Sequence, residues 1–445
     1  MLRSNANVPL LSCCGVDVVV EGVELQQACA DSPPDCVAVT RGCLCLRRVV
    51  ITSLLGSAVV VTGKQVSVRL ECCTISHAGK YGCFVTNGAS AEALDSAVED
   101  CQAAGVVSRG KGSAFRAERC TIHDNRGNGV GADEGGCANL GDCQLLDNRQ
   151  CGAMASGLLT CMQFARCIIA RNGTHGLAAA GRARISCVDH CQVKSNSALG
   201  CLIQSGASAE LANVSIKSNG AHGICLQLGG IATILQCKIV KNKQTGLAVM
   251  GADSRASAAE ITSSDNGIDG CHVGQGAELH LKESVLQNNR RMGLSALGLD
   301  TRAVVEGSVM TGSGEHGIAQ SQGAQVSVAN NTVKDNQGKD TVGHVHAICR
   351  SEQLADTAAP PSSAHPHAAG KSKCGQGTSE ETPLIGAAAG SGPGPRKRLI
   401  RHSVTALVCG LVFLVVLYIL SWFRFWRPLA AAAPSAHVRV AANGM

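Results

Sequence analysis

Residues 200–219 read GCLIQSGASAELANVSIKSN, and this stretch shows the unit from which most of the chain is built. Apolar residues alternate with polar ones over three short runs, which are marked by Cys201 and Ile203, by Ala209 and Leu211, and by Val214 and Ile216. Side chains two residues apart lie on the same side of a β-strand. The pattern therefore predicts three short strands in each unit.

The asparagine that closes this unit belongs to a column that recurs every 23 or 24 residues. Ser313 takes its place once, and the other members are Asn125, Asn148, Asn172, Asn196, Asn219, Asn242, Asn266, Asn289 and Asn336. A glycine follows four residues later in every unit up to Gly317, and Asp340 replaces it in the last. Such a period is typical of a solenoid, in which small units gain stability by stacking on their neighbours.

The composition of the unit indicates which solenoid this is. No unit contains an apolar run long enough for a helix, which argues against leucine-rich, ankyrin and armadillo repeats. None of the eleven prolines lies between Asp35 and Ala359, where each strand needs its N–H group for the sheet. We therefore expect an all-β parallel β-helix, with asparagines stacked in a corner where left-handed backbone angles are tolerated.

With this repeat the chain resembles the right-handed β-helix repeats of the pectate-lyase-like superfamily, including those of certain F-box proteins and of periplasmic copper-site maturation proteins. The resemblance covers residues 16–348 and implies a right-handed coil. It implies no single activity, because the superfamily holds lyases, hydrolases, epimerases, adhesins and scaffolds.

The remaining segments differ in composition from the repeat. Residues 1–15 form an N-terminal segment, 349–402 read as a flexible linker rich in Ala, Ser, Pro, Gly and His, and 424–445 form a short tail. Between them, 403–423 are predicted to form one transmembrane helix, because residues 404–423 carry no charge over a length that spans a bilayer.

The charges around this span predict its orientation. Four basic residues precede it (Arg396, Lys397, Arg398 and Arg401) and two follow it closely (Arg424 and Arg427), while residues 1–15 show no signal peptide. The positive-inside rule then places the β-helix in the cytosol, as in a single-pass, tail-anchored protein. The alternative is a lumenal or extracellular β-helix.

Candidate catalytic residues are few. The motifs of polygalacturonases, pectate lyases and alginate epimerases are absent from the sequence. Glycoside hydrolysis normally needs two carboxylates, and the nearest candidates are Asp124 and Asp147, one residue before Asn on adjacent turns. The same column continues with Arg171 and Ser195, which is typical of a corner that accepts any polar residue.

Metal and cofactor sites have little support in the sequence. His344 and His346 lie two residues apart, on one side of an expected strand, and are the candidate metal ligands. No C-x-x-C pair occurs, and many of the 25 cysteines share a column in which Val214 also stands, so they are expected to be small inward-facing residues. We expect no cofactor.

Aromatic residues are scarce before residue 401, where Tyr81, Phe84, Phe115 and Phe164 are the complete set. Sugar-binding grooves and single-stranded nucleic-acid sites usually stack rings on rings. The sequence therefore predicts a non-enzymatic, membrane-tethered scaffold that presents a surface to protein partners, with no nucleic-acid binding. The alternative is a polysaccharide-active enzyme or carbohydrate-binding protein of the superfamily, and a third hypothesis is a substrate-recognition module of a ubiquitin ligase.

The orientation can be tested through glycosylation. A lumenal β-helix would expose the sequons at Asn213 and Asn330 to modification during synthesis. For the cytosolic orientation we expect neither to carry a glycan, and we expect protease added outside intact microsomes to digest the β-helix. A mass shift on glycosidase treatment, or a protected β-helix, would reverse the orientation.

Overall fold

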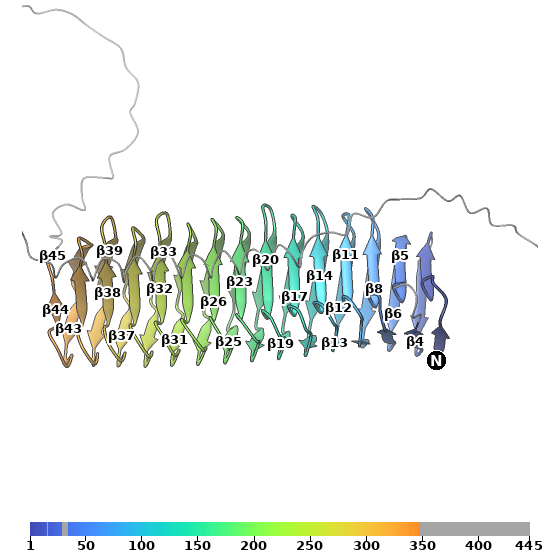
Figure 1. The fold of residues 1–445 in the computed structure, drawn as a ribbon, viewed down its shortest axis with the longest axis horizontal. Helices are drawn as coiled ribbons and strands as arrows, with labels where there is room; N and C mark the ends of the chain where they lie inside the picture. The colour runs from blue at the N-terminus through green and yellow to red at the C-terminus, as the bar shows by residue number, and fades with distance from the viewer. Residues whose placement is uncertain (16, 29–33, 348–445) are drawn as a thin grey trace, which may run out of the picture. The chain divides into compact units, whose positions relative to one another are not determined.

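The computed structural model describes residues 1–15, 17–28 and 34–347. Within these residues the chain forms strands, and they contain no helix that is long and apolar enough to cross a membrane. Corresponding strands of successive turns pair in parallel and build three 15-stranded sheets. Figure 1 shows the turns stacked one after another along the long axis. The predicted all-β parallel β-helix is confirmed, whereas the linker and the predicted transmembrane helix lie outside the described residues.

Each turn contributes one strand to each sheet. Sheet A contains β1 (Leu2–Ser4), β4 (Glu24–Gln27), β7 (Val50–Ser53), β10 (Thr74–Ser76), β13 (Ala97–Glu99), β16 (Thr121–His123), β19 (Gln144–Leu146), β22 (Ile168–Ala170), β25 (Gln192–Lys194), β28 (Ser215–Lys217), β31 (Lys238–Val240), β34 (Thr262–Ser264), β37 (Val285–Gln287), β40 (Val309–Thr311) and β43 (Thr332–Lys334). Sheet B contains β2 (Leu11–Cys14), β5 (Val37–Arg41), β8 (Val59–Thr62), β11 (Cys83–Thr86), β14 (Val106–Arg109), β17 (Val130–Asp133), β20 (Ala153–Ser156), β23 (Leu177–Ala180), β26 (Cys201–Gln204), β29 (Ile224–Gln227), β32 (Leu247–Met250), β35 (Cys271–Gly274), β38 (Leu294–Leu297), β41 (Ile318–Ser321) and β44 (Thr341–Val342). Sheet C contains β3 (Val18–Glu21), β6 (Cys43–Arg47), β9 (Ser67–Glu71), β12 (Ser90–Leu94), β15 (Ala114–Glu118), β18 (Cys137–Gly141), β21 (Cys161–Ala165), β24 (Arg184–Val188), β27 (Ser208–Ala212), β30 (Ile231–Leu235), β33 (Arg255–Ala259), β36 (Glu278–Lys282), β39 (Arg302–Glu306), β42 (Gln325–Ala329) and β45 (Val345–Ala347).

The coil begins earlier than the sequence pattern suggests. Strand β1 pairs with β4 and β2 pairs with β5, so residues before 16 already belong to the sheets. These turns lack the Asn and Gly columns. They keep the alternation of strands, because Leu25 and Cys13 point into the same core as the later turns.

The core is a narrow apolar column between the three sheets. Alternate residues of most strands point inward and are almost completely buried, as Ile203, Leu211 and Ile216 show for one turn. The inward cysteines Cys120 and Cys143 belong to this column and are free thiols. They occupy the place of Val214 in another turn, which agrees with their use as small apolar residues.

A ladder of buried asparagines runs along the corner between sheets A and B. The backbone N–H and the Nδ2 of Asn196 each donate to Oδ1 of Asn219, both at 3.0 Å. Nδ2 of Asn196 also donates to the carbonyl of Ile169 at 3.3 Å, which links three turns. The same arrangement joins the asparagines from Asn125 to Asn289, whereas Asn336 is half-buried at the C-terminal end of the column.

The difference between 23-residue and 24-residue turns arises mostly between sheets B and C. Five of these connections have four residues instead of three. One of them, 63–66, ends in Val66, and the other four end in a hydroxyl residue, namely Ser113, Thr160, Ser254 and Thr301. In each case the hydroxyl oxygen accepts a hydrogen bond from a backbone N–H of the preceding turn, at 2.9 to 3.1 Å. The inserted residue therefore leaves the strand register intact.

Replacing one ladder asparagine should destabilise the whole domain. In Asn219→Leu, the two Asn196 donors lose their acceptor while the site stays buried, and unsatisfied buried donors cost about 1 to 3 kcal/mol each. We expect a loss of about 3 kcal/mol or more in unfolding free energy, measured by thermal or denaturant melting. The control is Lys217→Ala, which changes an outward side chain two residues before Asn219. Equal melting temperatures for the two variants would contradict the ladder's role.

Candidate functional site

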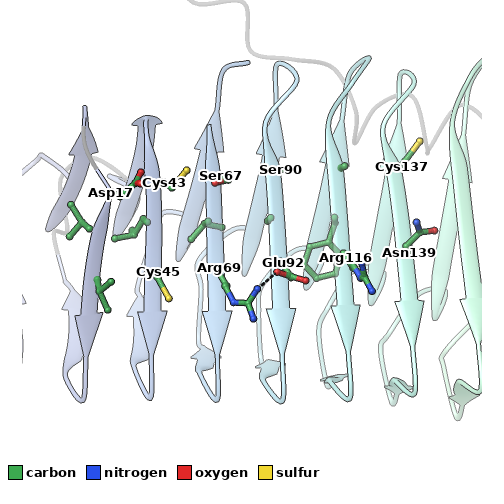
Figure 2. A pocket seen from close by; sticks show the side chains of 17 residues that line it. Asp17, Cys43, Cys45, Ser67, Arg69, Ser90, Glu92, Arg116, Cys137 and Asn139 are labelled. Carbon is green, nitrogen blue, oxygen red and sulfur yellow. Dashed lines mark hydrogen bonds and ion pairs between the residues drawn. The ribbon is translucent and has the colours of Figure 1, made fainter. Parts of the chain in front are cut away.

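A groove of about 570 Å³ lies on the outer face of sheet C, across strands β3, β6, β9, β12, β15 and β18. Two rows of outward side chains form it, as Figure 2 shows. The first row is small, with Ser67, Ser90 and Ala114 at the strand starts. The second row stands two residues further along each strand, and most of its side chains are long. The difference in size between the rows creates the hollow.

The second row presents one polar side chain per turn over four turns. It consists of Arg69, Glu92, Arg116 and Asn139, which are direct neighbours in the strand register. Nη1 of Arg69 donates to Glu92 at 2.6 Å and its Nε donates to Glu71, which also pairs with Arg47, so the charges of this network balance. Arg116 is exposed and has no ion-pair partner among the described residues. A guanidinium in that position can form paired hydrogen bonds with a carboxylate, sulfate or phosphate.

A disulfide lies at one end of this groove. Cys137, which lines the groove, is bonded to Cys161 on the next turn, with the two Cα atoms 4.7 Å apart. Both residues stand at the outward first position of their strands and are partly exposed. The cysteines of the inward column, Cys120, Cys143, Cys167 and Cys191, are free, in keeping with their expected use as small inward-facing residues.

The carboxylate candidates Asp124 and Asp147 lie elsewhere, on the corner between sheets A and B. Arg171 holds Asp147 through two hydrogen bonds of 2.9 and 2.6 Å. Asp124 contacts Nδ1 of His123 at 2.7 Å, and Nε2 of the same ring lies 3.0 Å from Glu99. The structure therefore gives each aspartate its own partner and brings neither into the groove.

The metal candidates His344 and His346 lie near the end of the described chain. Both side chains are exposed, and His346 stands in β45 beside Ser327. In the part of the chain that the structure describes, no three His, Cys, Asp or Glu side chains are grouped so that they could hold a metal ion.

A second column of hydrogen-bond acceptors follows the outer edge of sheet B. Its members are spaced by 47 residues, which is two turns, and are Asn128, His175, His222, Asp269 and His316. Each side chain accepts a hydrogen bond from a backbone N–H of the next turn, as Nδ1 of His175 does from Leu199 at 3.3 Å. The sequence shows the three histidines in one column, but it does not reveal that Asn128 and Asp269 share their role.

Burial shifts the titration of this column. The pKa of His175 and that of His222 are both lowered to about 4, mainly by burial, and the nearby His272 contributes to the shift of His222. Burial also raises the pKa of Asp269 to about 6, while the hydrogen bond from Met292 and the charge of Arg291 oppose the shift. His175 and His222 therefore carry neutral imidazoles at neutral pH.

Comparisons with known proteins identify the family to which this fold belongs. A family model described as "Right handed beta helix region" matches residues 57–213 and 199–349. No curated protein matches the chain. Among solved structures, the A-module of the mannuronan C-5 epimerase AlgE4 from Azotobacter vinelandii is 13% identical with a TM-score of 0.51, over 63% of this chain and 90% of that one.

Two further solved structures are also similar to this chain. The A-module of the mannuronan C-5 epimerase AlgE6 from the same organism is 13% identical, with a TM-score of 0.43 over 75% of this chain and 91% of that one. The pectate lyase Pel9A is 14% identical, with a TM-score of 0.34 over 66% of this chain and 62% of that one. At these identities the similarities concern the fold alone.

The acceptor column predicts an acid-sensitive stability. The folded-state pKa values of His175 and His222 lie below the ordinary value for histidine. Their contribution to the free energy of unfolding is therefore fully present above about pH 6.5 and is lost as the pH falls toward 4. Asn accepts the same bond without titrating, as Asn128 does. We expect the double variant His175→Asn and His222→Asn to lose less stability than the wild type between about pH 7 and pH 4.5, by up to about 3 kcal/mol per histidine.

Melting curves at both pH values measure this difference. Asp269 acts in the opposite sense, but it is common to both proteins and cancels in the comparison. His190→Asn, which changes an exposed histidine on another corner, is the matched control. Identical pH dependence in the double variant and the wild type would refute the role of the column.

Proposed function

Because the chain belongs to the family of proteins that contain a right-handed β-helix region, we propose that its groove on sheet C binds an extended acidic polysaccharide. The A-module of a mannuronan C-5 epimerase shares the fold over most of its own length, and its name gives a polysaccharide as substrate. This similarity supports a carbohydrate ligand over the protein-scaffold hypothesis, which gains no support from the comparisons.

The regularity of the groove suits a polymer. Its polar row offers one side chain per turn, and successive turns are about 4.8 Å apart. A linear chain that lies along the axis would meet Arg69, Glu92, Arg116 and Asn139 in succession. Small side chains in the neighbouring row leave room for its rings, and their hydroxyls at Ser67 and Ser90 can form hydrogen bonds with the ligand.

The charged residues of the groove balance overall, with Arg69 and Arg116 against Asp17 and Glu92, but the charge at Arg116 is not paired and favours an acidic group there. Arg116 carries this proposal, because it lines the groove and has no carboxylate partner among the described residues. Arg69 adds a second guanidinium, which Glu92 neutralises. A uronic-acid carboxylate or a sulfate on a sugar is a natural partner for Arg116.

The groove supports binding better than catalysis. Among its described lining residues the carboxylates are Asp17 and Glu92, and Arg69 holds Glu92. Polysaccharide hydrolysis usually needs two carboxyl groups placed on either side of the bond. We therefore propose a carbohydrate-binding protein, and the absence of the superfamily's catalytic motifs from the sequence agrees with this.

A polysaccharide ligand also bears on the proposed topology. Acidic polysaccharides lie outside the cytosol, so this function goes with the lumenal or extracellular orientation of a tethered β-helix. The partly exposed Cys137–Cys161 disulfide supports the same side, because disulfides persist mainly in oxidising compartments. The cytosolic, tail-anchored arrangement remains the competing proposal, and sequon occupancy distinguishes the two.

Binding measurements on the full-length protein test this function. We expect polygalacturonate or polymannuronate to bind and a neutral glucan not to bind, and we expect Arg116→Ala to weaken binding about tenfold or more, since a charge-assisted hydrogen bond contributes about 1.5 to 3 kcal/mol. Isothermal titration calorimetry provides both comparisons. Arg126→Ala removes an exposed arginine on the corner between sheets A and B and should have no effect. Unchanged affinity in Arg116→Ala would overturn the proposal.

A further inference from the structure

In the turns after residue 56, the exposed large apolar side chains of the described residues gather on one side of the solenoid, whereas the earlier turns also carry some on sheet A and on the corner between sheets A and B. Beyond residue 56, the described residues of this kind all lie on connections between sheets B and C or on sheet C itself, and they are Leu158, Leu159, Leu228, Ile231, Leu235 and Leu299. Sheet A, sheet B and the corners that join them contribute none in this range. An even scatter would be unremarkable, but segregation to one edge indicates a contact surface.

Four of these residues and two arginines line one edge within four turns, and the turn of β27 between the arginines and Leu228 contributes none of them. We call this set the leucine–arginine edge, and it consists of Leu158, Leu159, Arg182, Arg184, Leu228 and Ile231. The two leucines precede β21, the arginines flank the start of β24 on the next turn, and Leu228 and Ile231 lie at the start of β30, two turns further. The edge is therefore about 14 Å long along the axis.

The backbone of this edge makes its leucines unusual. Leu159 and Leu228 have φ angles of 63° and 52°, in the left-handed region. Corresponding positions on other turns hold Asn87, Asp253, Gln275, Asp300 and Gln322, which are polar. A left-handed conformation costs a residue with a side chain roughly 1 to 2 kcal/mol, and Asn and Asp tolerate it best. Leucine gains nothing from this backbone, and its side chain is 64% exposed at 159 and 56% at 228.

The charge of the edge is positive. Arg182 and Arg184 are exposed and form no ion pair within the described part of the chain, so they face solvent with Leu158 and Leu159 beside them. The nearest carboxylates along the stack are Glu134 one turn before, Asp253 one turn after Leu228, and Glu210 further along β27. The edge itself thus combines four aliphatic side chains with two cations and no anion.

From this combination we propose that the leucine–arginine edge docks on the surface of an anionic lipid bilayer. The aliphatic side chains stand at the tips of turns, where they can enter the interface between head groups and acyl chains, while the guanidiniums bind lipid phosphates. A protein partner fits less well, because protein hot spots favour aromatic anchors in pockets and under-represent leucine. Docking lays the solenoid against the membrane and is independent of the ligand in the groove.

Hydrogen exchange on the full chain, bound to vesicles, tests the contact. We expect amides of 157–160, 181–183 and 228–230 to exchange about tenfold more slowly on vesicles of phosphatidylcholine and phosphatidylglycerol than on phosphatidylcholine alone. Amides of the corresponding turns at 134–136 and 275–277 should be unaffected. Because only the difference between vesicles and between segments is compared, any membrane affinity of residues 404–423 does not decide the result.

The double variant Leu159→Asn and Leu228→Asn provides the decisive control. Asparagine suits the left-handed backbone, so we expect the melting temperature to stay the same or rise while protection on anionic vesicles is lost. Leu54→Asn changes another exposed leucine, on the corner between sheets A and B, and should retain protection. Unchanged protection in the double variant, equal protection on both kinds of vesicle, or protection that appears without lipid as protein concentration rises would overturn the proposal. None of these outcomes depends on polysaccharide binding by Arg116.

Discussion

The structure depends on one constraint, which is that every turn must return to the same register about 4.8 Å further along the axis. The asparagine ladder enforces this return at the corner between sheets A and B. The Oδ1 of each ladder asparagine accepts hydrogen bonds from the asparagine one turn earlier, and its Nδ2 donates to the asparagine one turn later, as Asn196 does with Asn172 and Asn219. Because a one-residue slip would place a polar residue in the core and leave buried amides unpaired, the ladder specifies register as well as stability.

Strict register turns the sequence into columns, and the columns carry the surface chemistry. Every position of the unit stacks on its equivalents, so a change in side-chain size or charge along a column becomes a feature of one face. The hollow on sheet C exists because Ser67, Ser90 and Ala114 are small where Arg184 and Arg255 stand in later turns. Alternating charges in a corner column give the paired Asp95–Arg119 and Asp142–Arg166 contacts in the same way.

Sequence reasoning recovers the features that repeat and misses those that depend on departures from the repeat. The fold follows from the period, from the inward apolar positions and from the absence of proline between residues 35 and 359. The groove does not, because its depth depends on how far neighbouring columns project. The roles of Asn128 and Asp269 are also hidden, since an amide and a carboxylate share a function with histidines only once the backbone N–H of the next turn is placed. To predict the Cys137–Cys161 disulfide from the sequence, one would need to know which of several cysteine columns faces outward.

Departures from the repeat also indicate where function lies, because the fold alone does not require them. Arg69 and Arg116 stand in the same row of sheet C, and Arg69 has an ion-pair partner in Glu92. On the turn after Arg116 the row continues with Asn139, which has no charge to neutralise Arg116. Leu159 and Leu228 occupy left-handed corners that polar residues fill on other turns. Each exception lowers local stability or leaves a charge or an apolar surface exposed, and neither improves packing within the solenoid. The two sets lie on different columns, at the middle of sheet C and at its edge toward sheet B, so one rigid scaffold can present a polymer-binding row and a membrane-contacting row without either altering the other.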